Sequence, residues 1–259
     1  MKIATWNVNS LRQRLTHLVD WLKLAQPDVV GLQELKLQDE QFPFAELEAA
    51  GYHAVCNGQK TYNGVGIISK HPIADVTRNM AAFEDEQRRV IAATVNGVRI
   101  VNVYVVNGQS VGSPKYEYKL RWLDALRDFV DDEIRNGAPV AVTGDFNIAP
   151  TPEDTHDAAY WAGKILCSEP ERAAFRALLD LGLTDAFDQI VAPSGRFTWW
   201  DYRMGAFRRN LGLRIDHVLL SQALAQRCAS WHVDTAPRRL DRPSDHAPVV
   251  AELGGMIGA

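Results

Sequence analysis

Short apolar runs alternate with amphipathic segments along the whole chain. Residues 2–6 form an apolar run that ends at Asn7, and leucines then recur at helical spacing through residues 11–25, until Gln26-Pro27 interrupts the pattern. This predicts a buried strand followed by a helix. The same alternation predicts further strands at residues 29–32, 52–55, 64–69, 90–95, 98–106, 140–143, 198–200, 215–220, 232–235 and 249–253, and helices at residues 116–135 and 168–181.

Local turn and capping signals indicate the class of fold. Asn96-Gly97 joins two of the predicted strands and is typical of a tight hairpin. Ser168 and Glu171 have the spacing of a capping box at a helix start. Hairpins mixed with helical crossovers favour an α/β sandwich over a simple doubly wound sheet. Because no repeat, low-complexity run or linker interrupts the pattern, we expect a single domain over residues 1–259.

Polar residues stand where the predicted strands end. Asn7, Glu34 and Asp145 follow apolar runs, and Asp216 lies inside one. Alone, such a residue is most often a turn residue or a helix cap, and a single histidine such as His246 is most often structural. Together they are harder to explain in this way, because a carboxylate in a buried strand costs free energy unless it is paired or bound to a metal. Converging acidic and amide oxygens suit Mg²⁺, so these residues indicate a magnesium-dependent phosphoryl-transfer or hydrolysis site.

The composition narrows the classes of function. The chain has 259 residues and a formal net charge of −4, which is not the basic balance of a protein that binds nucleic acid by charge alone. Its three cysteines include no CxxC pair, which argues against a disulfide framework or structural zinc and favours the reducing cytoplasm. No signal peptide or membrane span is evident, and the lack of a long apolar stripe or heptad pattern favours a monomer.

Eight short motifs are spread over residues 5–249 and so cover almost the whole chain. They are Thr5–Arg12, Leu32–Lys36, Tyr62–Gly66, Asn102–Gly108, Gly144–Asn147, Trp199–Arg203, Gly212–Asp216 and Ser244–Val249. In type and order they resemble the motifs of the exonuclease III family of DNA-repair nucleases. The resemblance implies a four-layered α/β sandwich, in which two mixed β-sheets pack face to face with helices on the outside. It also implies a Mg²⁺-dependent phosphodiesterase, with Mn²⁺ as an alternative ion, that acts on double-stranded DNA at an abasic site or a 3′ end.

The resemblance assigns roles to the polar residues at the strand ends. Glu34 resembles the principal metal ligand, with Asn7 and Asp245 near the metal. Asp145 resembles the group that orients or deprotonates the attacking water, and Asn147 resembles its hydrogen-bonding companion. A carboxylate in this role has to be ionised.

Three further residues complete the implied site. His246 resembles the histidine that contacts the phosphate and is held by Asp216, and Tyr104 resembles the tyrosine beside the scissile phosphate or the leaving oxygen. A carboxylate hydrogen-bonded to a histidine fixes its tautomer and favours the imidazolium, which suits an anionic phosphate.

The resemblance also points to residues that bind DNA. Asn107 matches a phosphate-contacting position, and Trp199 with Leu213 lines the pocket that receives an extrahelical abasic sugar. Plain core packing is the alternative for Trp199. Basic residues near the matched motifs are candidates for phosphate contacts, although most surface charges are simply solvated. These candidates are Arg12, Lys36, Lys60, Arg203, Arg208 and Arg209.

Leu166 departs from the family pattern, because relatives that cleave abasic sites carry a very small residue at the aligned position. Either the leucine fills the space for the flipped-out sugar and favours 3′→5′ exonuclease and 3′-phosphatase activity, or it packs in the core under the following helix.

Two other functions of the protein stay open. One is a superfamily phosphatase or phosphodiesterase acting on inositol phosphates or sphingomyelin, although Phe197–Arg203 fits the nuclease branch better. The other is a DNA-binding scaffold, which would not need the complete set of catalytic positions.

Overall fold

The computed structural model describes residues 1–191 and 195–255. It contains two β-sheets, and the first of them includes both the first strand and the last strand of the chain. We call it sheet A. Its strands are β1 (Lys2–Asn7), β2 (Val29–Gln33), β3 (His53–Asn57), β4 (Val65–Ser69), β11 (Cys228–Val233) and β12 (Val249–Leu253). They are hydrogen-bonded in the order β11-β12-β1-β2-β4-β3. The β1–β2 pair is parallel and the other pairs are antiparallel, so the sheet is mixed.

The second sheet, sheet B, is also mixed and also has six strands. These are β5 (Ile73–Arg78), β6 (Val90–Val95), β7 (Val98–Tyr104), β8 (Val140–Asp145), β9 (Leu183–Asp185) and β10 (Asp216–Ser221). Their order is β5-β6-β7-β8-β10-β9, with β7 and β8 parallel. β6 and β7 form the hairpin that Asn96-Gly97 predicts.

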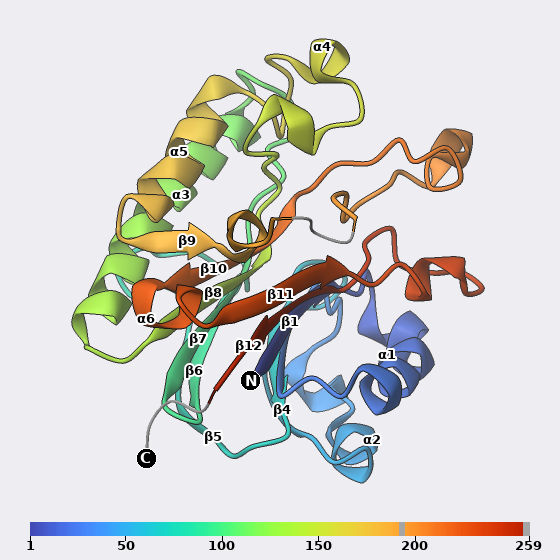
Figure 1. The fold of residues 1–259 in the computed structure, drawn as a ribbon, viewed down its shortest axis with the longest axis vertical. Coiled ribbons are helices and arrows are strands. Elements are labelled where there is room, and N and C mark those ends of the chain that lie inside the picture. The colour runs from blue at the N-terminus through green and yellow to red at the C-terminus, as the bar shows by residue number, and fades with distance from the viewer. Residues whose placement is uncertain (192–194, 256–259) are drawn as a thin grey trace.

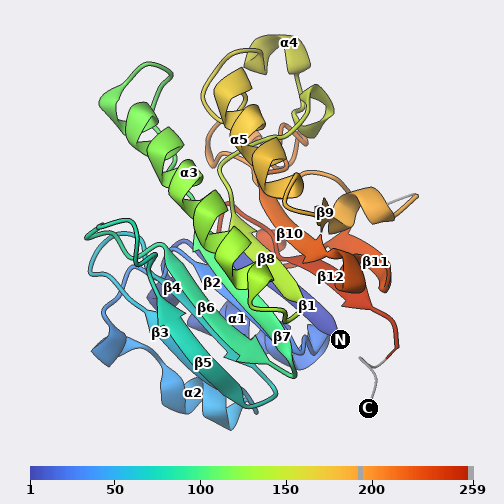
Figure 2. The same cartoon turned by 90° about the vertical axis from the view of Figure 1, so that its left-hand side faces the viewer.

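Helices cover the outer faces of both sheets, as Figures 1 and 2 show. The helices are α1 (Leu11–Ala25), α2 (Phe44–Ala49), α3 (Pro114–Arg135), α4 (Ala158–Trp161), α5 (Glu169–Leu179) and α6 (Gln222–Ala225). Apolar side chains of α1 and α2 pack on sheet A, and those of α3 and α5 pack on sheet B. Among the described residues, no helix has the length and apolar character needed to cross a membrane.

A third apolar cluster fills the space between the two sheets. It includes Ile3 and Val29 of sheet A together with Ile100 and Val218 of sheet B, all fully buried. The order of layers is therefore helix, sheet, sheet, helix. This confirms the predicted four-layered sandwich of two mixed β-sheets with helices outside.

Some predicted elements differ from those in the structure. The predicted strand at residues 198–200 is wrong, because Trp199 makes only isolated bridges, to Leu213 and His246. Two edge strands, β5 and β9, were not predicted. The burial pattern of β5 is mostly half-exposed or exposed, and β9 has only three residues, so neither carries an apolar alternation that the sequence would show.

The ends of five strands meet at one edge of the sandwich. In sheet B, Asp145 at the end of β8 pairs in register with Asp216 at the start of β10 and with Tyr104 at the end of β7. Gly144 permits this close pairing, since a Cβ there would lie 2.0 Å from the carbonyl oxygen of Val103. In sheet A, β1 and β2 run parallel, so that both end at this same edge.

Candidate active site

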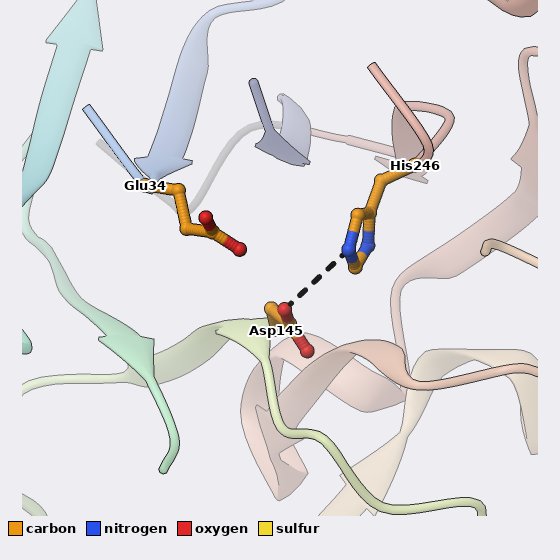
Figure 3. A group of neighbouring side chains, drawn as sticks. All are labelled: Glu34, Asp145 and His246. Atoms are coloured by element: carbon orange, nitrogen blue, oxygen red, sulfur yellow. Dashed lines mark ion pairs between the residues drawn. The ribbon is translucent and has the colours of Figure 1, made fainter. Parts of the chain in front are cut away.

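Three titratable side chains converge between the ends of the two sheets. Glu34 follows β2, Asp145 ends β8, and His246 precedes β12. One ligand atom from each lies within 4.8 Å of the others, and Figure 3 shows the three side chains directed at a common space. Glu34 reaches this position with a left-handed backbone, at a φ of 51°. Because sheet A supplies one carboxylate and sheet B the other, the site depends on the packing of the two sheets.

Asn7 links the two carboxylates of this group. Its Nδ2 donates to Glu34 Oε1 and to Asp145 Oδ2, at 2.9 Å in both cases. Its Oδ1 accepts from the backbone N–H of Asn9 at 2.9 Å, which fixes the orientation of the amide. The side chain is fully buried. Asn7 therefore holds Glu34 and Asp145 at a fixed separation.

His246 lies between two aspartates. Its Nδ1 is 2.9 Å from Asp216 Oδ2, and its Nε2 is 3.7 Å from Asp145 Oδ2. Thr198 Oγ1 donates to the same Asp216 oxygen at 2.6 Å. Burial alone would lower the pKa of His246, but the charges of Asp216 and Asp145 outweigh it and raise the pKa to about 10. The imidazolium is thus the stable form at neutral pH, with Nε2 directed into the site.

Asp145 is almost completely buried. Burial raises its pKa to about 7, although the positive charge of His246 and the hydrogen bond from Asn7 favour the carboxylate. Its Oδ1 accepts from the backbone N–H of Asn147 at 2.9 Å. A further positive charge beside Asp145 would lower this pKa and keep the group ionised at neutral pH.

Tyr104 stands at the end of β7, next to Asp145. Burial and the negative charges of Glu34 and Asp145 raise the pKa of its phenol well above the usual range, so the phenol stays protonated and can donate. The guanidinium of Arg89 lies 4.7 Å from the centre of the Tyr104 ring and donates to the Tyr104 backbone oxygen at 3.1 Å. Arg89 therefore holds both the ring and the backbone of the tyrosine.

Two asparagines pair beside this group. Asn107 Nδ2 donates to Asn147 Oδ1 at 3.0 Å, and Asn147 Nδ2 donates to the backbone oxygen of Val105 at 3.0 Å. Asn147 has a left-handed backbone, at a φ of 49°. The pair joins the loops that follow β7 and β8.

Asp245 lies at the rim, outside the group formed by Glu34, Asp145 and His246. Its two oxygens accept from Trp199 Nε1 and from Asn9 Nδ2, both at 2.9 Å. Lys36 approaches Glu34 Oε2 at 2.8 Å and Asn9 Oδ1 at 2.6 Å. Asn9 thus connects Asp245 to Lys36 and Glu34.

An apolar wall borders the site on the side of Trp199. Trp199 packs against a buried apolar cluster that contains Leu213 and Leu166, and it bridges to Leu213. Leu166 is 5% exposed and has a left-handed backbone, at a φ of 71°. The structure therefore brings together the three residues that the sequence predicts for the sugar pocket.

The other predicted basic residues lie on the surface. Arg203 is exposed and held by Asp201, with Nη2 2.6 Å from Oδ2. The remaining four are exposed as well and are Arg12, Lys60, Arg208 and Arg209. Their predicted contacts with DNA stay a prediction, as do the catalytic and metal-binding roles of the residues above.

Sequence reasoning missed several residues that organise this site, among them Asn9 and Arg89. Asn9 lies in the motif Thr5–Arg12, so its position beside Asn7 was visible, but its contacts with Asp245 and Lys36 depend on the tertiary fold. Arg89 stands directly before an apolar strand, in a pair with Arg88, and was one surface charge among many.

Comparison with known proteins places this geometry in a family. A model of the endonuclease/exonuclease/phosphatase family matches residues 4–246. The chain belongs to this family. Within it, the chain is 36% identical to exodeoxyribonuclease III of Haemophilus influenzae, over 98% of this chain and 100% of that protein. As a member of the exonuclease III branch, it is a phosphodiester hydrolase of the exodeoxyribonuclease III and AP endonuclease type. The group Glu34, Asp145 and His246 has the composition and spacing of a cluster that could hold a metal ion.

Solved structures of family members superpose closely on the chain. A 3′-phosphatase from Neisseria, NExo, bound to a product DNA hairpin, is 50% identical with a TM-score of 0.96, covering 98% of this chain and 100% of that one. The 3′-5′ exonuclease NExo from Neisseria meningitidis is 51% identical with the same TM-score and coverage. An AP endonuclease from Archaeoglobus fulgidus is 37% identical with a TM-score of 0.94, again over 98% and 100% of the two chains.

Proposed function

We propose that this protein is a Mg²⁺-dependent nuclease that trims the 3′ ends of double-stranded DNA, as a 3′→5′ exonuclease and a 3′-phosphatase, and that it incises abasic sites poorly. The observation that carries the proposal is Leu166, which is buried in the apolar cluster against which Trp199 packs, in a protein that also brings Glu34, Asp145 and His246 together. The high identity to Neisseria proteins described as a 3′-phosphatase and a 3′-5′ exonuclease supports the same substrate class.

The donor set fits one hard divalent cation. Oxygens on opposite sides of Mg²⁺ lie about 4 Å apart, because the bonds are about 2.0–2.1 Å long. Glu34 and Asp145 offer carboxylate oxygens within 4.8 Å of each other, which is close to this span. We propose that Glu34 is the principal ligand, with Asn7 and Asp245 in its surroundings. When bound, Mg²⁺ supplies positive charge to the phosphoryl oxygens as a Lewis acid.

The residues of the chain divide the remaining chemistry among them. Asp145 accepts the proton of the attacking water and is oriented by Asn7 and Asn147. His246, kept charged by Asp216, binds a non-bridging phosphate oxygen through Nε2. Tyr104 donates its phenolic proton in a hydrogen bond to the scissile phosphate or the leaving oxygen.

Further residues extend the proposal to the DNA. Asn107 binds a phosphate beside Asn147. Basic side chains contact phosphates along the duplex, which gives a protein of negative net charge a local surface for DNA. The phosphate-binding residues are Arg12, Lys36, Lys60, Arg203, Arg208 and Arg209. We further propose that the protein acts as a monomer of one domain in the cytoplasm, in keeping with the free thiols of Cys56, Cys167 and Cys228.

Leu166 excludes the sugar of an abasic site by occupying its pocket. Its side chain is buried in one apolar cluster with Leu213 and Ile215, and Trp199 packs against this cluster. A 3′-phosphate needs no such pocket, because only the phosphoryl group enters the site. Glycine also suits the φ of 71° better than leucine does, so Leu166→Gly opens the pocket without backbone strain.

The test uses a duplex with an internal abasic-site analogue and blocked 3′ ends, incubated with Mg²⁺. We expect Leu166→Gly to gain abasic-site incision by about one to two orders of magnitude, the effect of a pocket misfit. Leu178→Ala is the control, because it empties a buried position in α5 away from the pocket. A Leu166→Gly variant that gains no incision would show that Leu166 packs in the core without selecting the substrate. Release of phosphate from inositol phosphates without any cleavage of DNA would contradict the whole proposal.

A further inference from the structure

The side chain of Lys119, in the first half of α3, is completely buried. Its Nζ is 2.5 Å from Glu171 Oε1, 2.7 Å from the backbone oxygen of Asn147 and 3.2 Å from that of Asn107. All three partners are acceptors, so the bonds use three N–H groups, which only the ammonium form has. Burial lowers the pKa of Lys119, and the carboxylate of Glu171 opposes this shift.

Glu171 carries these contacts onward to the loop before α5. Its Oε1 accepts from the backbone N–H of Leu166 at 3.0 Å. Its Oε2 accepts from the backbone N–H of Ser168 at 3.1 Å and from Ser168 Oγ at 2.6 Å. Ser168 Oγ in turn lies 2.7 Å from the hydroxyl of Tyr116 on α3. Helix α3 and the Leu166 loop are therefore joined by one continuous buried network.

This network reaches both sides of the site. Asn107 and Asn147 form the phosphate side, and Leu166 belongs to the apolar wall of the pocket. Asn147 and Leu166 both have left-handed backbones, which cost free energy unless hydrogen bonds hold them. Lys119 accounts for one of these bonds, at the Asn147 carbonyl, and Glu171 for another, at the Leu166 amide.

Stability alone does not explain a buried ion pair at this place. Such a pair is commonly no more stabilising than apolar residues of the same volume, because the free energy needed to remove two charges from water is about as large as the free energy of their attraction. Its advantage is a fixed geometry, since every donor and acceptor has a set partner. Here the fixed partners are the backbone groups of residues proposed to bind substrate.

We propose that Lys119, paired with Glu171, is a positioning residue of the active site. It holds the Asn107–Asn147 pair beside the scissile phosphate and couples that pair to the loop of Leu166. Because Lys119 is fully buried, it acts through backbone carbonyls and does not touch the substrate. The inference rests on the proposed function only for the identity of the substrate. The effect of Lys119 on the loops does not depend on the proposed function.

The test compares two buried ion pairs on the same helix. Lys119→Met keeps the length of the side chain and removes its charge. Glu133→Gln is the matched control, because it breaks the buried pair with Arg99 (2.8 Å) near the other end of α3, away from the site. Each variant is measured for DNA Kd, for kcat on a 3′-phosphate duplex with Mg²⁺, and for deuterium exchange of residues 105–109, 146–150 and 164–168.

For Lys119→Met we expect kcat to fall by about 10²-fold at temperatures where the protein is folded, the effect of a small misplacement of reacting groups. The DNA Kd should stay close to that of the unchanged protein, and exchange should rise in all three segments. Glu133→Gln should alter neither kcat nor the exchange of these segments, even if it lowers the melting temperature as much as Lys119→Met does. Should Lys119→Met not fold, Glu171→Gln replaces it with the same expected changes.

Two results would overturn the proposal. One is a folded Lys119→Met protein with unchanged kcat, and the other is unchanged exchange in all three segments. Absence of nuclease activity in the unchanged protein would instead contradict the proposed function. In that case the exchange measurement still decides whether Lys119 positions the loops.

Discussion

Asp145 shows how the neighbours of one carboxylate define what it can do. One oxygen accepts a hydrogen bond from the backbone of Asn147, and the other accepts from Asn7 and faces His246. Burial raises its pKa to about 7, and a positive charge beside it keeps the group ionised, so that it can accept a proton at neutral pH. The same contacts prevent rotation of the carboxylate. Hydrogen bonds therefore orient the carboxylate, whereas its burial is what raises the pKa.

Replacing this carboxylate by an amide tests its role. Asp145→Asn keeps the shape of the side chain but cannot accept the proton of the attacking water. We expect kcat to fall by about 10²–10⁴-fold, the usual contribution of a general base. DNA affinity should be retained, because the phosphate contacts are unchanged. Single-turnover cleavage and fluorescence anisotropy with labelled duplex measure the two quantities, with exposed Asp128→Asn as control. Undiminished turnover would exclude Asp145 as the base.

At the scale of elements, apolar strands could be predicted because their burial leaves a clear pattern. Residues 2–6 and 249–253 became β1 and β12, paired as neighbours in sheet A. Edge strand β5 could not be predicted, since its half-exposed residues carry no such pattern. The segment 198–200 has strand-like residues but bridges to Leu213 and His246 without a ladder, so tertiary contacts outweigh its local preference.

The candidate site was predictable in part for the same reason. Glu34, Asp145 and Asp216 contradict the apolar pattern around them, and that contradiction is visible in the sequence. Lys119 was not predictable, because a lysine in an amphipathic helix normally faces solvent. Its burial follows from the packing of α3 against the loop before α5, which one sequence does not reveal.

A second buried network anchors the strand that carries Asp216. Arg214 Nε lies 2.7 Å from Asp154 Oδ1, and its Nη1 lies 2.5 Å from Asp185 Oδ2. Burial alone would raise the pKa values of both aspartates. The charge of Arg214 outweighs this effect and holds both pKa values below their usual range. A carboxylate whose pKa is lowered in the folded state stabilises the fold at pH values above its unfolded-state pKa of about 3.9. This stabilisation is lost as the pH falls from there toward the folded-state pKa.

Removing the cation of this network should destabilise the protein. Arg214→Met leaves Asp154 and Asp185 buried without their partner, so the free energy of unfolding at pH 7 should fall by about 3–5 kcal/mol. The difference from the unchanged protein should shrink progressively as the pH falls below about 5 and through the unfolded-state pKa of about 3.9, because protonation removes the unpaired charges in the variant. Urea unfolding at several pH values measures it, with exposed Arg135→Met as control. A loss that is constant with pH would mean that packing, and not charge, is what Arg214 contributes.

At the scale of the molecule, a protein of net charge −4 has to concentrate its positive charge to bind DNA. The loop after Trp200 carries Arg203, Arg208 and Arg209, all exposed. The C-terminal half of helix α3 instead mixes acidic with basic residues, and the acidic ones include Asp128, Asp131 and Asp132. This end of α3 leads into the start of β8, whereas Asp145 stands at the opposite end of that strand.

This asymmetry predicts that two pairs of arginines differ in their effect on DNA binding. Replacing Arg208 and Arg209 together by alanine should weaken the affinity and reduce the slope of log K against log salt by about 2, because two fewer phosphates are neutralised. Replacing Arg127 and Arg135 of α3 should leave both the affinity and the slope unchanged. Titrations of labelled duplex at several salt concentrations measure both quantities. Equal effects of the two double variants would show that binding follows the net charge and not a local surface.

The substrate preference is most directly tested with one 5′-labelled duplex strand that carries an internal abasic-site analogue and a recessed 3′ end. The unchanged protein is incubated with Mg²⁺ or with EDTA, and the product lengths are read from a gel. We expect a ladder that shortens from the 3′ end while the abasic site stays uncut, and no product in EDTA. A single early band at the abasic site, or cleavage that persists in EDTA, would contradict a metal-dependent enzyme that prefers 3′ ends.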